Sequence, residues 1–152
     1  MKKQTFVIPF RLPSLNEVIA QNRRNPYAGA KLKKETENDI SGEIFAAKLN
    51  HVDAPCIVHM VFDEPNRRRD ADNVESAKKF ILDALVKSGV LENDNPAHVV
   101  APPSYTRYGE GGASVTVTIV EDPNKTALRE RLRRASDKLT EDDCNGDQIQ
   151  TP

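Results

Sequence analysis

Two aspartates, Asp70 and Asp72, stand directly after a run of three arginines, Arg67–Arg69. The segment lies where an apolar, strand-like run gives way to a helical pattern. In extended backbone, positions i and i+2 point to the same side, so both carboxylates can face one ion. Hard oxygen ligands of this kind suit Mg²⁺ or Mn²⁺. The segment therefore predicts a divalent metal site beside a concentration of positive charge.

Further polar residues extend this constellation. Asp94 is the best placed third acid, where the chain leaves the following helix and turns toward the next strand, and Glu92 could substitute for it. At about 100° per residue, Lys79 and Asp83 each fall roughly 20° from Asp72 around the helix axis. The three side chains are thus expected on one polar face.

Each of these features also has a purely structural interpretation. Asp72 followed by Glu75 fits a capping box with Asp72 as the helix N-cap. Lys79 and Asp83 fit an exposed i,i+4 ion pair. An EF-hand loop is excluded, because its sixth position would be Glu75 instead of glycine.

The composition is that of one small domain. The chain has 152 residues, 38% hydrophobic and 30% charged. No apolar run approaches the roughly 20 residues of a membrane span, and the N-terminus lacks a signal-peptide pattern, so we expect a cytoplasmic protein with no membrane partner. Cys56 and Cys144 form no disulfide framework, and the three histidines show no zinc-ligand spacing.

Charge is unevenly distributed along the chain. The net charge is −1, but residues 137–152 hold five acids and one base, which leaves a mildly basic remainder. Bases cluster at Arg23-Arg24, at Lys31–Lys34 and at Arg67–Arg69. Such clusters create local positive potential that fits a nucleic-acid partner, although each alone also fits a solvated surface.

The hydrophobic patterns predict an α/β (α+β) fold in one small domain, a mixed sheet covered by helices in the order β-α-β-α-β-β. A mostly polar, functional or mobile segment is expected up to Gly29, and Gly109–Gly112 is expected to form a hairpin loop. The predicted elements are strand 5–10, helix 31–49, strand 56–62, helix 73–88, strand 98–101 and strand 114–119. The domain is expected to span 1–122, followed by a charged C-terminal helix (123–139) and a disordered acidic tail (140–152).

The motifs follow one another in a specific order. They are Pro13-Ser14-Leu15-Asn16, then Arg67–Asn73, Lys79, Asp83-Ala84-Leu85, Ser88-Gly89 and Asn93-Asp94. From Pro9 to about Ile119 this pattern resembles that of the RusA family of Holliday-junction resolvases, crossover junction endodeoxyribonucleases often encoded by phages or prophages. The resemblance implies a RusA-like, Mg²⁺-dependent homodimer that cuts symmetric strands of a four-way DNA junction in recombination and repair.

The resemblance also implies roles for individual residues. Asp70, Asp72 and Asp94 match the family's metal-binding acids. Lys79 matches its catalytic lysine, counted back from the matched Asp-Ala-Leu. The spacing from the second acid to this lysine is about three residues longer than is usual, so Lys78 is the alternative. Where the family commonly has two adjacent acids, this chain has Asn93-Asp94. The metal-binding role therefore falls to the second position, Asp94.

The remaining candidates concern DNA. We expect Arg67, Arg68 and Arg69 to contact flanking phosphates, with help from Arg23 and Arg24. Further candidates are Asn16 for DNA and Asn73 and Asp83 for the site. Two alternatives stay open: a junction-binding protein without turnover, and a nuclease for flaps or replication forks.

Overall fold

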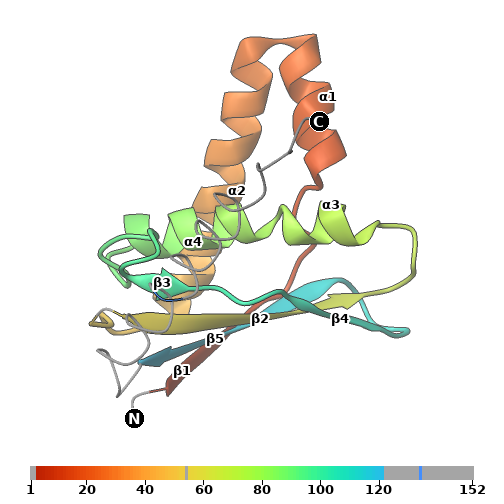
Figure 1. Ribbon diagram of the computed structural model, residues 1–152. Helices are drawn as coiled ribbons and strands as arrows, with labels where there is room; N and C mark the ends of the chain where they lie inside the picture. Colours follow the sequence, from red (N-terminus) through yellow and green to blue (C-terminus); the bar gives the residue numbers. More distant parts are fainter. Residues whose placement is uncertain (1–2, 54, 122–133, 135–152) are drawn as a thin grey trace, which may run out of the picture. The chain divides into compact units, whose positions relative to one another are not determined.

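The computed structural model describes residues 3–53, 55–121 and 134. The chain divides into two compact units, Met1–Asp122 and Pro123–Pro152, and all elements described below belong to the first. This unit is a small α+β domain with a mixed five-stranded sheet, which confirms the predicted fold class (Figure 1). The predicted helix 123–139 lies outside the described residues except for Arg134, and the tail 140–152 lies wholly outside them. No helix within the described ranges is long and apolar enough to cross a membrane.

The apolar strand β2 (Cys56–Glu64) lies inside the sheet. On one side it pairs antiparallel with β5 (Ser114–Glu121), which in turn pairs antiparallel with β1 (Lys3–Ile8). On the other side it pairs in parallel with two short strands, β3 (Val99–Val100) and β4 (Tyr105–Tyr108). Alternate residues of β2 and β5 are buried, so one face of the sheet carries the core.

The expected hairpin around Gly109–Gly112 is wrong. β4 was not predicted, and it pairs with β2 at Val61↔Tyr105, whereas β5 pairs with the opposite edge of β2. The glycine-rich loop therefore carries the chain across β2 and does not join two paired strands. Local turn signals could not reveal this, because the arrangement depends on β2 being paired along both of its edges.

The core face of the sheet is covered by α3 (Ala71–Glu75) and α4 (Lys78–Lys87) (Figure 1). The predicted apolar stripe of this segment is confirmed, and all its members are buried: Val74, Ala77, Phe80, Ile81, Ala84 and Leu85. Gly89, with φ +73°, ends α4 as expected. The amides of Gly89 and Val90 donate to the carbonyls of Val86 and Leu85, the Schellman arrangement.

Two details of this segment differ from expectation. The predicted single helix 73–88 begins earlier, at Ala71, and is interrupted at Ser76-Ala77. Its N-cap is Asp70, so the capping box proposed for Asp72 and Glu75 is wrong. The interruption also removes the basis for aligning Asp72 with Lys79 by a constant 100° per residue.

The polar segment before Gly29 is not a loop. It forms α1 (Leu15–Arg24), and α2 (Pro26–Ala46) begins five residues before the predicted helix and ends three before its expected end. Ser14 and Glu17 make a complete capping box at the start of α1, which explains why a polar sequence begins a helix here. α1 and the first half of α2 form a hairpin that projects from the helix layer on the side away from the sheet, whereas the second half of α2 passes behind α4 (Figure 1), where Ile40 and Ile44 are buried in the core.

The cap of α1 predicts a pH-dependent contribution to stability. Burial raises the pKa of Glu17, but hydrogen bonds from Arg11 and from Ser14 outweigh it and lower that pKa from 4.5 to about 2. A carboxylate with a depressed pKa stabilises the folded state above its unfolded pKa, and this contribution is lost as the pH falls toward the folded value. We expect Glu17→Gln to lower the free energy of unfolding at pH 7 by about 1 kcal/mol, a small effect because solvent screens a half-exposed pair.

Urea unfolding at pH 7 and at pH 2.5 measures this difference. The difference in free energy of unfolding between wild type and Glu17→Gln should be smaller at pH 2.5 than at pH 7. Glu35→Gln, at an exposed acid of α2, is the matched control and should stay within about 0.5 kcal/mol of wild type at pH 7. A gap for Glu17→Gln that is equally large at both pH values would contradict the assignment.

Candidate active site

Asp70 and Asp72 lie at the start of α3, after the loop that follows β2. Asp70 is the N-cap residue, with extended backbone (φ −66°, ψ 154°), but its side chain makes no capping hydrogen bond. Asp72 lies within the first helical turn, so the expected extended i,i+2 geometry does not hold for this pair. Both residues are exposed, and neither carboxylate has a hydrogen-bond or ion-pair partner within the described residues.

This lack of partners sets the two aspartates apart from the acids around them. The neighbouring acids all have basic partners, within 3.0 Å: Glu64–Arg69, Asp63–Arg107, Glu75–Lys78, Asp83–Lys79 and Asp94–Lys79. Asp70 and Asp72 remain unpaired even though three arginines directly precede them. Both carboxylates are therefore exposed to solvent beside positive charge, and within the described residues neither makes a hydrogen bond or an ion pair.

The three arginines of the motif have different environments. Arg69 is partly buried, with 10% of its side chain exposed, and its Nη1 lies 3.0 Å from Oε1 of the buried Glu64. Burial lowers the pKa of Arg69, against the opposing effect of Glu64. Arg67 is exposed and its guanidinium stacks 4.5 Å from the ring centroid of Tyr108, while Arg68 is exposed. Thus Arg67 and Arg68 are exposed to solvent, Arg67 with one face on Tyr108, whereas Arg69 holds the loop to the end of β2.

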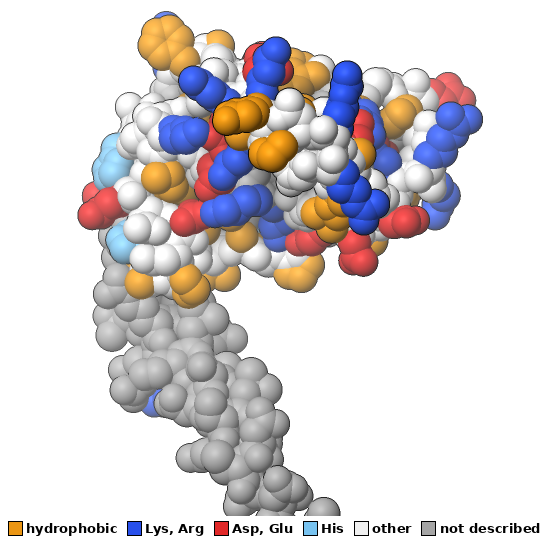
Figure 2. All heavy atoms as spheres, turned by 90° about the horizontal axis from the view of Figure 1, so that it is seen from above, with side chains coloured by type: hydrophobic (Ala, Val, Ile, Leu, Met, Phe, Trp, Pro, Cys, Tyr) orange, Lys and Arg blue, Asp and Glu red, His pale blue; other side chains and the backbone are white. Residues whose placement is uncertain are grey.

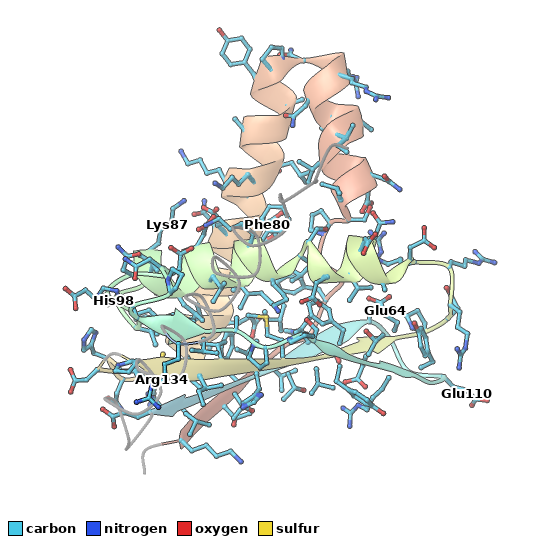
Figure 3. All side chains as sticks on the ribbon, viewed as in Figure 1. Glu64, Phe80, Lys87, His98, Glu110 and Arg134 are labelled. Carbon is cyan, nitrogen blue, oxygen red and sulfur yellow. The ribbon has the colours of Figure 1, made fainter. Side chains whose placement is uncertain are left out.

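The structure brings the Pro13–Asn16 motif into contact with the Arg67–Asn73 motif. The amide of Asn16 in α1 donates to Oδ1 of Asn73 in α3 at 3.4 Å. Nη2 of Arg69 also donates to the Asn73 carbonyl at 3.4 Å. Residues separated by 57 positions thus meet at the start of the helix layer, close to the acid pair. Glu64, which anchors Arg69, lies between this part of the layer and the sheet (Figure 3).

Lys79 lies at the start of α4 and joins two acids. Its Nζ is 2.9 Å from Oδ1 of Asp83 and 2.7 Å from Oδ2 of Asp94, and its side chain is 64% exposed. Hydrogen bonds to Asp94 and Asp83 raise the pKa of Lys79, so its charge is retained well above neutral pH. The expected i,i+4 pair of Lys79 and Asp83 is therefore confirmed, and Asp94 is an additional partner.

Lys33 of α2 is a basic residue that sequence reasoning did not single out. Its Nζ lies 3.4 Å from Oδ2 of Asp83 and 3.7 Å from Oε1 of Glu37. It thereby links the helical hairpin to the same acid that contacts Lys79. The sequence indicates only that Lys33 belongs to the basic cluster Lys31–Lys34, because Asp83, which it contacts, lies 50 residues away.

Lys78, the alternative lysine, has a different environment. Only 12% of its side chain is exposed, and its Nζ donates to Oε1 of Glu75 at 2.6 Å and to the Pro102 carbonyl at 2.7 Å. Glu75 in turn accepts from the Ser104 amide at 3.2 Å. Lys78 therefore ties the helix layer to the segment before β4, and the exposed Lys79 is the better candidate to contact a ligand.

The three predicted metal-binding acids do not come together as one group. Within the described residues, no cluster of three or more His, Cys, Asp or Glu side chains has a geometry that could hold a metal ion. Asp94 is bound to Lys79, and its place beside Asp70 and Asp72 stays a prediction. Arg23 and Arg24 lie at the outer end of α1, in the hairpin.

The fold and the site together define a small α+β domain with an unpaired acid pair and exposed arginines at one end of its helix layer. Neither a scan against protein-family models nor a search of curated proteins finds a match to this chain. The resemblance to the RusA family therefore rests on the order of the sequence motifs.

Proposed function

We propose that this protein is a Mg²⁺-dependent endonuclease that cuts branched DNA. The observation that carries the proposal is the pair of exposed carboxylates, Asp70 and Asp72, which have no partners within the described residues and lie close in sequence to the exposed Arg67 and Arg68. The acids nearby in this chain have basic partners, whereas these two carboxylates have none within the described residues. Two unpaired acids beside exposed arginines fit a site whose partners are a cation and a polyanion.

The donor set of the acid pair fits Mg²⁺. Proteins usually hold this ion through one or two carboxylates, with water and substrate phosphate completing the shell. Asp70 and Asp72 provide such oxygens, and Mn²⁺ accepts the same ligands. When bound, the ion would supply a nucleophile at neutral pH and neutralise charge that develops on the scissile phosphate. Asp94 as a third ligand remains part of this proposal.

The other residues of the site position the DNA. Arg67 and Arg68 contact phosphates on either side of the cleaved bond, which orients the strand without reading its sequence. Arg69, through Glu64, fixes the loop that carries Asp70. Lys79 stabilises negative charge on the phosphate or on the leaving oxygen. A four-way junction has two equivalent cleavage points, so a twofold-symmetric dimer with one site per subunit suits this substrate.

One observation favours a second candidate, a junction-binding protein without turnover. Lys79 is already engaged by two carboxylates, Asp83 and Asp94, and must leave at least one of them to contact a phosphate. This candidate predicts tight binding of junctions and no nicking at any concentration of Mg²⁺ or Mn²⁺.

The test is a comparison of substrates. Wild-type protein is incubated with a labelled four-way junction, a flap, a replication fork and a linear duplex in Mg²⁺. We expect nicks at symmetric positions of the junction and little cleavage of the duplex. Preferential cleavage of flaps or forks would identify those structures as the substrate. Binding without cleavage would favour the second candidate.

The two adjacent lysines should behave differently in this assay. Lys79→Met should lower the single-turnover cleavage rate about 100-fold, because a charge that stabilises the transition state is lost. Lys78→Met should instead lower stability, by about 1–3 kcal/mol, because it leaves Glu75 and a carbonyl without their donor. Its cleavage rate per folded molecule should stay close to that of wild type. The reverse pattern would assign the catalytic role to Lys78.

A further inference from the structure

The outer end of the helical hairpin is an exposed tip with capped helix ends. A single residue, Asn25, ends α1 and begins α2. Its amide donates to the Gln21 carbonyl, and its side chain accepts from the Tyr27 amide at 2.9 Å. Pro26 occupies the first turn of α2, where its fixed φ suits the helix. Capping on both sides therefore fixes the direction of the tip residues.

The two helices of the hairpin also approach one another closely. Gly29 in α2 is buried, and a Cβ at this position would lie 1.6 Å from Oδ1 of Asn22 in α1. The absence of a side chain at Gly29 thus allows the helices to pack just below the tip. In Figure 1 the hairpin stands out from α4, and the turn that joins α1 and α2 is the part farthest from the sheet.

The tip combines positive charge with an exposed aromatic ring. Residues 18–34 contain five bases and no acid. Arg23, Arg24 and Lys34 form no ion pair within the described part of the chain. Tyr27 is 82% exposed, although aromatic side chains are usually at least partly buried. Figure 2 looks onto the molecule from the hairpin side and shows lysine and arginine side chains spread over this face, with apolar and some acidic side chains between them.

These features fit one kind of partner. An unpaired cluster of bases attracts a polyanion, and a single exposed ring among them can stack on a nucleobase. In a continuous duplex both faces of each base are covered by its neighbours, so a tyrosine has no free face to meet. Bases beside a branch point have such a face. The tip therefore suits DNA whose stacking is interrupted.

We propose that the hairpin tip recognises the branch point, with Tyr27 stacked on a base that the branch exposes and Arg23 and Arg24 on the phosphates beside it. This inference rests on branched DNA being the substrate, as proposed above. Tyr27 lies six residues before Lys33, about 9 Å along α2, which is on the order of three nucleotides of a strand. Because Lys33 contacts Asp83, the tip is within a few nucleotides' reach of Lys79.

Binding without cleavage tests this inference. Fluorescence anisotropy compares a four-way junction with a linear duplex of the same sequence, in the absence of divalent ions. We expect Tyr27→Ala to weaken junction binding about 10-fold and duplex binding less than about twofold, and Tyr27→Phe to retain the preference. Phe45→Ala is the matched control, because Phe45 is an 88% exposed ring near the other end of α2, and it should change neither affinity. Arg23→Ala should weaken both complexes alike and reduce their salt dependence.

Three results would overturn the inference. The first two are a junction preference that Tyr27→Ala leaves unchanged and an equal loss of affinity for junction and duplex. The third is a change of oligomeric state in Tyr27→Ala on sedimentation, which would assign the ring to contacts between copies of the protein. The outcome is separable from that of the nuclease proposal. A protein that cleaves junctions and whose junction preference is unchanged in Tyr27→Ala overturns the inference alone. A junction preference that depends on Tyr27, in a protein that never nicks DNA, supports the inference and overturns the nuclease.

Discussion

Asp70→Asn and Asp72→Asn should each lower Mg²⁺-dependent cleavage of a four-way junction at least ~100-fold, because loss of a charged ligand removes several kcal/mol of transition-state stabilisation. Both side chains are exposed and make no hydrogen bond or ion pair within the described residues, so neither substitution should disturb folding. Binding of the junction without metal should be retained or strengthened, since each change removes a negative charge near the phosphates. Single-turnover cleavage and anisotropy on the same preparations measure the two effects.

The matched control for these variants is Asp39→Asn. Asp39 is also an exposed aspartate, but it lies within α2, away from the arginine motif. This change should leave cleavage within about twofold of wild type. If both Asp70→Asn and Asp72→Asn keep wild-type cleavage, the assignment of the acid pair to the metal is refuted.

Arg69→Ala should be the most destabilising single change at the arginine motif. Arg69 and Glu64 form a largely buried pair, with side chains 10% and 6% exposed, and removal of the arginine leaves the buried Glu64 carboxylate without its partner. Breaking such a pair costs about 3–5 kcal/mol. Arg68→Ala, at an exposed neighbour, should change stability by less than about 0.5 kcal/mol but weaken DNA binding. Urea unfolding and DNA-binding assays on both variants separate the structural arginine from the one available to DNA.

A double substitution sharpens this test. Arg69→Met combined with Glu64→Leu removes both charges and should recover much of the stability lost in Arg69→Ala, because an apolar pair has no uncompensated buried charge. A variant Arg69→Ala that is as stable as wild type and loses affinity for DNA would contradict the structural role. Such a result would instead support the expectation from the sequence that Arg69 contacts DNA phosphates.

The elements that could be predicted from the sequence are those whose signals are local. The stripe from Val74 to Leu85 repeats at helical spacing, and Gly89 supplies the positive φ that a helix end of this type requires. The run at Cys56 has the length and β-branched content of a buried strand. Each pattern involves residues within a few positions of one another, so no knowledge of the fold was needed.

The helical hairpin was missed although local signals for it exist. Ser14 and Glu17 have the spacing of a capping box, and Asn25-Pro26 has the types favoured at an N-cap and at the next position. The segment from Leu15 to Gly29 is mostly polar, so its caps are the main local sign of the two helices. The interruption at Ser76-Ala77 carries neither proline nor glycine, so nothing local predicts it.

For the candidate site, the sequence predicted the residues better than their partners. It predicted Asp70, Asp72, Lys79 and Asp94 as the polar groups of interest, but not that Lys79 would bind Asp94. It also could not distinguish Arg69 from Arg68, because burial beside Glu64 depends on how the loop returns to the end of β2. Contacts between residues distant in the sequence decide both points.

The whole proposal depends first on whether Asp70 and Asp72 hold a divalent ion. Titration of isotope-labelled protein with Mn²⁺, followed by paramagnetic broadening of backbone amide signals, measures this without any requirement for activity. We predict that signals of residues 70–73 broaden at lower Mn²⁺ concentrations than those around Asp39 or Asp53, and that excess Mg²⁺ reverses the effect. In a protein with both Asp70→Asn and Asp72→Asn this early broadening should vanish. Signals at residues 70–73 that persist after those around Asp39 and Asp53 have broadened would contradict a metal site at the acid pair.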